Sequence, residues 1–212
     1  MIPLYDDNRA RRTFPFITIG LIGLNVLMFL MELTAGDRFI TNWSFVPSRF
    51  LSNPDGEWLT IFSSIFMHSG WLHLLGNMLY LGIFGDNVED RMGHFKYLLF
   101  YLLCGVAATF TQFAFSMSSD IPMLGASGAI AGVLGSYLLL FPQGNVYMLF
   151  FRFITPVPAW VALGVWIVIQ LISGAGSLMD SSQTGGVAYL AHVGGFFAGV
   201  FFTLPFSKRI RY

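Results

Sequence analysis

Apolar segments long enough to enter a lipid bilayer recur along this chain and leave few alternatives to a membrane fold. Hydrophobic residues make up 55% of the 212 positions and charged residues only 10%, against about 25% charged residues in soluble domains. A helix crosses the roughly 30 Å hydrocarbon core with about 20 mostly apolar residues. Six segments are predicted to be such helices, the second and fourth being short: residues 16–33, 71–84, 95–115, 127–141, 157–172 and 187–206.

The positions of the basic residues predict how these helices are oriented. Six crossings place both termini on one side, and that side holds all of the 11 basic residues except Arg38 and Arg49. Because Lys and Arg are enriched in cytoplasmic loops, both termini, including the short segment 1–15, are expected in the cytoplasm. Residues 35–70 would then form an external loop, seated in the membrane interface by aromatic side chains such as Trp43 and Trp58.

The remaining segments complete an all-α membrane protein in which residues 1–212 form a single domain. Residues 146–154 are apolar, but Arg152 and the following prolines predict a piece that lies on the surface or is half inserted. Residues 174–186, rich in Gly and Ser, are expected to form an external loop that could act as a mobile lid.

Composition also restricts the partners and cofactors. A formal net charge of +0 offers no basic face to a nucleic acid, so the expected partner is lipid or a protein embedded in it. Cys104 is the only cysteine, which excludes a disulfide framework and a thiolate metal cluster. His73 and His192, which lie in apolar segments, lack Cys or carboxylate neighbours. Neither a metal nor another cofactor is therefore expected.

Polar side chains inside the apolar segments are the candidates for function, because hydrocarbon makes an unpaired polar group cost several kcal/mol. Ser127 opens the fourth segment and His192 lies in the sixth. A serine is a weak nucleophile unless a base takes its proton, and a histidine can do so. His73 and Asn77, four residues apart on one helix face, could both donate hydrogen bonds to an oxyanion. These four residues suggest a serine–histidine dyad with an oxyanion hole.

Small residues surround the proposed dyad at informative positions. Gly125 and Gly128 flank the serine and would let backbone N–H groups approach a substrate carbonyl. Gly195 and Gly199 are four residues apart, a spacing that allows membrane helices to pack backbone to backbone. Such packing could bring the serine and the histidine within hydrogen-bonding distance. His68, just before the second segment, is expected to have a structural role in tying the external loop to that helix.

Three motifs in order resemble those of the rhomboid family of intramembrane serine proteases. Residues 68–77 resemble its His-x4-His-x3-Asn motif, residues 125–128 its Gly-x-Ser-Gly motif and residues 191–199 its Ala-His-x2-Gly-x3-Gly motif. Residues 85–93 also resemble the family's cytoplasmic turn after the second helix.

The resemblance implies a six-helix bundle of the prokaryotic type. It also implies that Ser127 is the nucleophile, that His192 is the general base and acid, and that the oxyanion donors are His73, Asn77 and the Ser127 N–H group. The chain departs from the family at two places. Ala131 stands where certain rhomboids carry a Tyr that stacks on the catalytic histidine, so other groups must orient the histidine here. Residues 57–60 stand where many members have a Trp-Arg pair.

The resulting hypothesis is a multi-pass serine endopeptidase of the bacterial inner membrane that cleaves transmembrane segments of single-pass membrane proteins. Its site would open to the non-cytoplasmic face above the two short helices. Substrates are expected to enter beside the fifth segment, where Trp160, Trp166 and Phe153 are bulky enough to form a gate.

Two alternatives lack protease activity. One is a catalytically silent rhomboid-like protein that binds transmembrane helices without cutting them. A transporter is the other, and the absence of a convincing internal repeat speaks against it.

Overall fold

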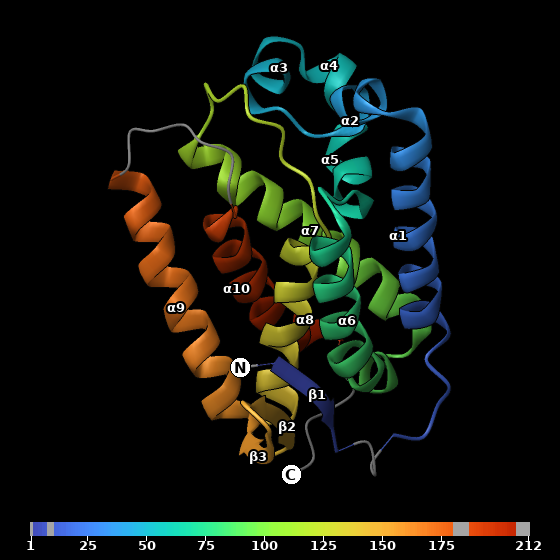
Figure 1. Ribbon diagram of the computed structural model, residues 1–212, viewed down its shortest axis with the longest axis vertical. Coiled ribbons are helices and arrows are strands. Elements are labelled where there is room, and N and C mark those ends of the chain that lie inside the picture. The colour runs from blue at the N-terminus through green and yellow to red at the C-terminus, as the bar shows by residue number, and fades with distance from the viewer. Residues whose placement is uncertain (1, 8–10, 180–186, 207–212) are drawn as a thin grey trace.

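Six helices of 14 to 22 residues form a bundle in the described part of the chain, which comprises residues 2–7, 11–179 and 187–206 of a computed structural model (Figure 1). The long helices are α1 (Phe16–Ala35), α6 (Trp71–Met92), α7 (His94–Phe115), α8 (Ser127–Leu140), α9 (Ala159–Met179) and α10 (Tyr189–Phe206). Among the described residues, α1, α7, α9 and α10 are long and apolar enough to cross a membrane. The chain is therefore an integral membrane protein that is mostly helical.

The helix boundaries agree with four of the six predicted segments to within two residues. The fifth helix, α9, continues seven residues beyond its predicted end to Met179, so the prediction of an external loop is wrong for residues 174–179. The rest of the predicted lid, residues 180–186, lies outside the described residues. So do Arg9 and the three basic residues near the C-terminus that contributed to the predicted orientation.

The largest boundary error concerns α6, which continues through the predicted turn at residues 85–93 and ends only at Met92. Its last turns remain helical because their charged side chains are paired. The fully buried carboxylate of Glu89 accepts hydrogen bonds from the N–H groups of Ile17 (2.9 Å) and Thr18 (2.8 Å), in the first turn of α1. Helix starts leave such N–H groups without intrahelical partners and favour a negative charge. Asp86 pairs with Arg11 at 2.5 Å.

A three-stranded antiparallel sheet at one end of the bundle departs from the all-α prediction. β1 (Ile2–Asp6), β2 (Asn145–Phe150) and β3 (Phe153–Pro158) pair in that order. Segment 146–154 was predicted to lie on the surface or to be half inserted, without a strand. Val146 and Met148 are buried two residues apart, which is the period of a strand. The prolines that follow this segment, Pro156 and Pro158, belong to β3 and are tolerated there because β3 is an edge strand.

Asp6 attaches β1 to the helices. Its Oδ2 atom accepts hydrogen bonds from the Tyr137 hydroxyl of α8 (2.7 Å) and from Asn87 Nδ2 of α6 (2.8 Å). Phe206, at the end of α10, lies beside Phe100 near the start of α7, with ring centroids 6.4 Å apart. The first and last described residues therefore lie at the same end of the bundle (Figure 1).

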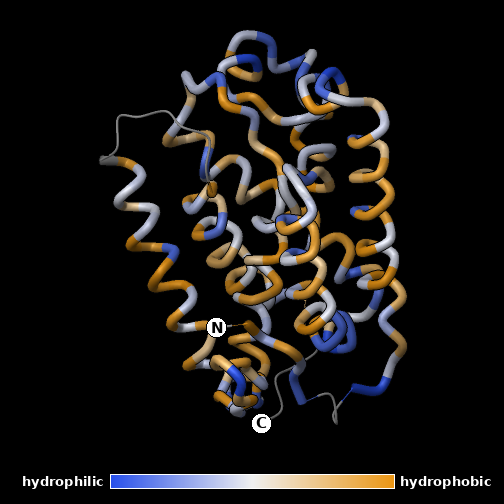
Figure 2. The backbone as a smooth tube through the Cα atoms, in the orientation of Figure 1, coloured by the Kyte–Doolittle hydropathy of each residue, from blue (hydrophilic) through white to orange (hydrophobic). Residues whose placement is uncertain are grey.

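Residues 36–66 cover the opposite end and form short helices instead of the predicted loop. They are α2 (Asp37–Trp43), α3 (Pro47–Ser52), α4 (Pro54–Glu57), α5 (Thr60–Ser63) and the 3-10 helix η1 (Ser64–Phe66). Hydrophilic residues gather here and in the last turns of α6, and apolar residues dominate the bundle between them (Figure 2). Arg49 donates to Glu57 (2.7 Å), which joins α3 to the place where the sequence departs from the family's Trp-Arg pair.

Helix α8 passes through the centre of the bundle and contacts α10 backbone to backbone. A Cβ atom added at Gly195 would overlap the carbonyl oxygen of Gly128, and one added at Gly199 would overlap that of Gly132. These contacts agree with the close packing predicted from the spacing of the small residues. They bring the start of α8 against the first turns of α10.

Candidate active site

Ser127 and His192 meet where α8 and α10 cross. Ser127 is the first residue of α8, and its Oγ atom lies 2.8 Å from Nε2 of His192, which is the fourth residue of α10. This distance lies within the range of about 2.6–3.2 Å over which a base can take a proton from a nucleophile. The N–H group of Ser127 belongs to the first turn of its helix and has no intrahelical partner.

Gly125 makes room for a second imidazole beside the serine. Its φ of 138° is a backbone conformation that L side chains rarely adopt. A Cβ atom there would lie 3.0 Å from Nε2 of His73 and 3.5 Å from Oγ of Ser127. Nε2 of His73 and the serine hydroxyl therefore border the same small space.

The partner of the other His73 nitrogen fixes the role of Nε2. Nδ1 of His73 lies 3.4 Å from the backbone nitrogen of Ser69 and 3.1 Å from its hydroxyl oxygen. A backbone N–H group can only donate, so Nδ1 accepts and the proton of the neutral ring belongs on Nε2. His73 thus presents an N–H donor toward the space beside Ser127.

Asn77 lies one turn after His73 and is held by the ring of His68. Its Nδ2 atom is 3.0 Å from His68 Nε2, and one of the two N–H bonds of the amide satisfies that contact. The backbone N–H of His68 donates to the Glu32 carboxylate of α1 at 3.1 Å. The backbone of His68 thus joins the end of the segment of short helices to α1. Its ring contacts Asn77 of α6, the helix to which the sequence was predicted to tie it, and orients the Asn77 amide.

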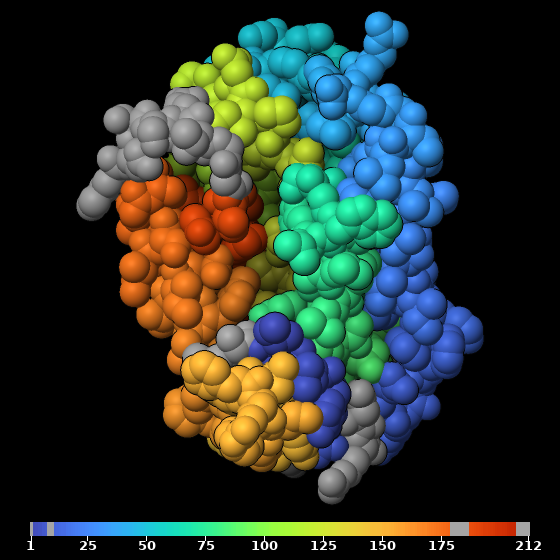
Figure 3. Space-filling view, viewed as in Figure 1, coloured from blue at the N-terminus to red at the C-terminus, as the bar shows by residue number. Residues whose placement is uncertain are grey.

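A cavity of about 1500 Å³ runs between α6, α8, α9 and α10 and contains the predicted site. Its walls include the four predicted polar side chains, Ser127, His192, His73 and Asn77. Figure 3 shows the hollow between α6 on one side and α9 and α10 on the other, with α8 at its floor. The site is therefore accessible from outside the bundle.

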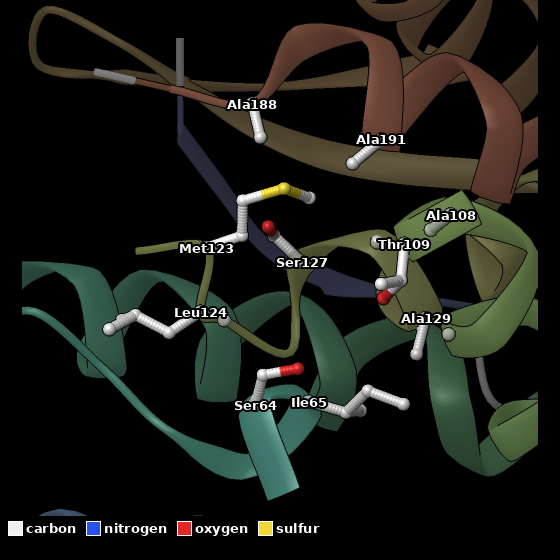
Figure 4. A pocket seen from close by; sticks show the side chains of 13 residues that line it. Ser64, Ile65, Ala108, Thr109, Met123, Leu124, Ser127, Ala129, Ala188 and Ala191 are labelled. Carbon is white, nitrogen blue, oxygen red and sulfur yellow. The ribbon is translucent and has the colours of Figure 1, made fainter. Parts of the chain in front are cut away.

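A smaller cavity of about 40 Å³ is also lined by Ser127. In Figure 4 the Ser127 hydroxyl points toward the side of this cavity that Met123, Ala188 and Ala191 border. Ser64, Thr109 and several apolar residues form its other walls. A water-sized group fits in this space.

Three residues that contact the site differ from the sequence-based expectation. Gln170 of α9 and Glu32 of α1 were missed, although each is a polar side chain inside an apolar segment and could have been found by that criterion. Trp166, expected to form part of a gate, lies beside the ring of His192. The large cavity is lined by Trp166 and not by Phe153 or Trp160, which lie toward the end of the bundle that holds the sheet.

The described residues contain no group of three or more His, Cys, Asp or Glu side chains placed to hold a metal ion. The polar groups closest to the Ser127 hydroxyl include the imidazoles of His192 and His73, and the carboxamides of Gln170 and Asn77 contact His192 and His68. Such a set suits proton transfer and hydrogen bonding.

The fold and the site define an integral membrane protein that holds a serine, histidines and an asparagine together around a cavity in its helical bundle. The chain belongs to the rhomboid family, because residues 55–209 match the family described as "Rhomboid domain".

Curated relatives lie in bacteria and eukaryotes. "Rhomboid protease GluP" of Bacillus subtilis is 32% identical over 208 residues, which cover 92% of this chain and 37% of the relative. "Rhomboid protein 1, mitochondrial" of Saccharomyces cerevisiae is 29% identical over 199 residues, covering 92% of this chain and 54% of the relative. "Putative rhomboid protease YdcA" of Bacillus subtilis is 29% identical over 130 residues. The chain thus spans about half of the yeast relative and about a third of GluP.

Proposed function

We propose that this protein is an intramembrane serine endopeptidase that cleaves transmembrane segments of single-pass membrane proteins. The observation that carries the proposal is the 2.8 Å contact between Ser127 Oγ and His192 Nε2 in the wall of a cavity inside a membrane bundle. Two bacterial relatives are named as rhomboid proteases, one of them putatively, which supports the same activity here.

In the proposed reaction, Ser127 attacks the carbonyl carbon of a peptide bond while His192 takes the hydroxyl proton. His192 then protonates the leaving amine, and water completes hydrolysis of the acyl-enzyme by the same steps. His73, Asn77 and the Ser127 N–H group donate hydrogen bonds to the oxyanion. These donors are fixed in place before the reaction, so they need no reorganisation as the negative charge develops.

The proposed topology has six crossing helices within one domain, residues 1–212. Helices α6 and α8 would cross the membrane in addition to the four helices that are long and apolar enough to do so by themselves. Both termini would lie in the cytoplasm of a bacterial cell, and the cavity would open to the non-cytoplasmic face of the cell membrane. The short α8 supports this arrangement, because it places Ser127 below the covered end of the bundle, where water can reach it through the cavity.

Substrate choice follows from the backbone chemistry of a membrane helix. A formed helix satisfies its own N–H and C=O groups, which hides the peptide bonds from a nucleophile. The protein would therefore cut helices that unwind near the non-cytoplasmic face.

The test is labelling of the purified protein in detergent with a fluorophosphonate probe, which reacts with activated serines and requires no known substrate. The parent should be labelled, Ser127→Ala and His192→Ala should not, and Ser136→Ala should be labelled like the parent. Ser136 is a matched control because it is a fully buried serine of the same helix, outside the two cavities.

A folded parent that is not labelled and does not cut a generic transmembrane substrate would overturn the proposal. It would favour a rhomboid-like protein that binds transmembrane helices without cutting them. Full labelling of His192→Ala would refute the role of the histidine as the base.

A further inference from the structure

The second ring nitrogen of His192 determines whether the first can act as a base. A neutral imidazole carries one proton, so Nε2 accepts the Ser127 proton only when the ring proton is on Nδ1. The partner of Nδ1 therefore selects the reactive tautomer. In serine hydrolases that use a triad, a carboxylate fills this position.

Here Nδ1 of His192 faces a glutamine. The Oε1 atom of Gln170 lies 2.7 Å from Nδ1, a distance at which it accepts a hydrogen bond from an Nδ1–H group. Gln170 is 8% exposed, although its neighbours in sequence, Ile169 and Leu171, are exposed on the outer face of α9. A carboxamide buried in an apolar helix is stabilised by a partner, and His192 provides one.

Aromatic rings hold the same imidazole from two further directions. The ring of Trp166, one turn before Gln170 on α9, lies 6.0 Å from the His192 ring at an interplanar angle of 32°. The ring of Tyr189 meets it edge-on, with a centroid distance of 6.5 Å and an angle of 88°. Since Ala131 of α8 has no ring to offer, α9 and the start of α10 supply the groups that fix the plane of the histidine.

We propose that Gln170 is a positioning residue whose carbonyl oxygen accepts the Nδ1 proton of His192. The contact holds Nε2 free to take the Ser127 proton, and it stabilises the imidazolium once that proton has moved. A neutral amide orients the ring without placing a permanent charge in the bundle, where an unpaired charge is costly. This inference rests on the proposed endopeptidase function and adds a third member to its proton-transfer chain.

The test compares two variants at position 170 with a control on the same helix. Gln170→Leu keeps much of the side-chain volume but removes the acceptor, and Gln170→Glu keeps acceptor oxygens. Gln170→Leu should lower kcat by about ten-fold to a hundred-fold with little change in KM, because a buried donor loses its neutral partner. Gln170→Glu should restore most of kcat. Ile169→Ala, on the exposed face of α9, should match the parent.

The spectroscopic readout is the ¹⁵N chemical shift of labelled His192, assigned by comparison with His192→Ala. The parent should show a proton on Nδ1, and Gln170→Leu should show a mixture of tautomers. A folded Gln170→Leu with parental kcat and the parental ¹⁵N spectrum would overturn the proposal. So would a folded Gln170→Glu that is as slow as Gln170→Leu. If Gln170→Leu does not fold, the kcat of Gln170→Glu and the tautomer of His192 in the parent decide whether the proposal stands.

The two proposals can fail separately. The ¹⁵N measurement can be repeated in the Ser127→Ala background, where no catalysis is possible. A parent that neither labels nor cleaves but shows the Nδ1 proton would overturn the endopeptidase function and leave the Gln170 contact intact. A labelled, active parent that carries its proton on Nε2 would do the reverse.

Discussion

Replacing Gly195 with alanine should separate α8 from α10 and open the contact between Ser127 and His192. The added Cβ would overlap the carbonyl oxygen of Gly128 and lie 2.9 Å from its carbonyl carbon. Carbon atoms in packed interiors rest at about 3.5 Å from one another, and the overlap with the oxygen is larger than the overlap with the carbon, so the two backbones must part by about 1 Å. Gly128 follows the serine directly, and Gly195 follows the histidine by three residues. The 2.8 Å contact should therefore lengthen to about 3.8 Å, beyond hydrogen-bonding range.

The rate of substrate cleavage should fall by about 10²-fold, which is typical when a reacting group moves by about an ångström. Overpacking of this kind should also lower the free energy of unfolding by about 1–3 kcal/mol. The assay is the initial rate of cleavage of a transmembrane substrate in detergent, measured together with thermal unfolding. Gly23→Ala on α1 is the matched control, because a Cβ there has no neighbour within 4 Å. A folded Gly195→Ala protein that cleaves at the parental rate would refute the reasoning.

Two further predictions concern the oxyanion site and Asp6, at the end of the bundle that holds the sheet. Asn77→Ala should lower kcat by about 10²–10³-fold while the protein still folds, as for loss of one oxyanion donor, and a parental kcat would contradict this role. Burial raises the pKa of Asp6 from 3.8 to about 6. Because the folded protein then binds this proton more tightly, the stabilisation is complete below about pH 4 and is lost, up to about 3 kcal/mol, as the pH rises past 6. Between pH 4 and 7 the free energy of unfolding, measured from denaturation curves, should fall by more in the parent than in Asp6→Asn; equal losses in the two proteins would contradict the prediction.

The sequence predicted the main site residues because hydrocarbon makes polar side chains conspicuous. Ser127 and His192 interrupt apolar segments, and the small residues around them occur at a helical spacing. Both features are local, and both are visible without knowing how the helices are arranged. The predicted roles in catalysis remain proposals, but the side chains named for them line one cavity.

The features that were not predicted depend on contacts between distant parts of the chain. In the sequence, Gln170 resembles any polar residue that joins two membrane helices. Its contact with His192 depends on how α9 is rotated against α10. The helical ending of α6 depends on partners more than 70 residues earlier, such as Thr18 for Glu89. The sheet requires residues 2–6 to pair with residues 146–149. Periodicity within a segment carries no information about such partners.

The cap that Glu89 places on α1 also sets an order for assembly during synthesis. Thr18 leaves the ribosome 71 residues before the carboxylate that receives its hydrogen bonds. The first helix therefore reaches the membrane with its leading N–H groups still unsatisfied by protein, and they remain so until α6 has been made and has folded back beside it. Strand β1 forms its sheet later still, because its partner β2 begins only at Asn145. The end of the bundle that holds the sheet is thus completed late, after the helices that carry His73 and Ser127 have been translated.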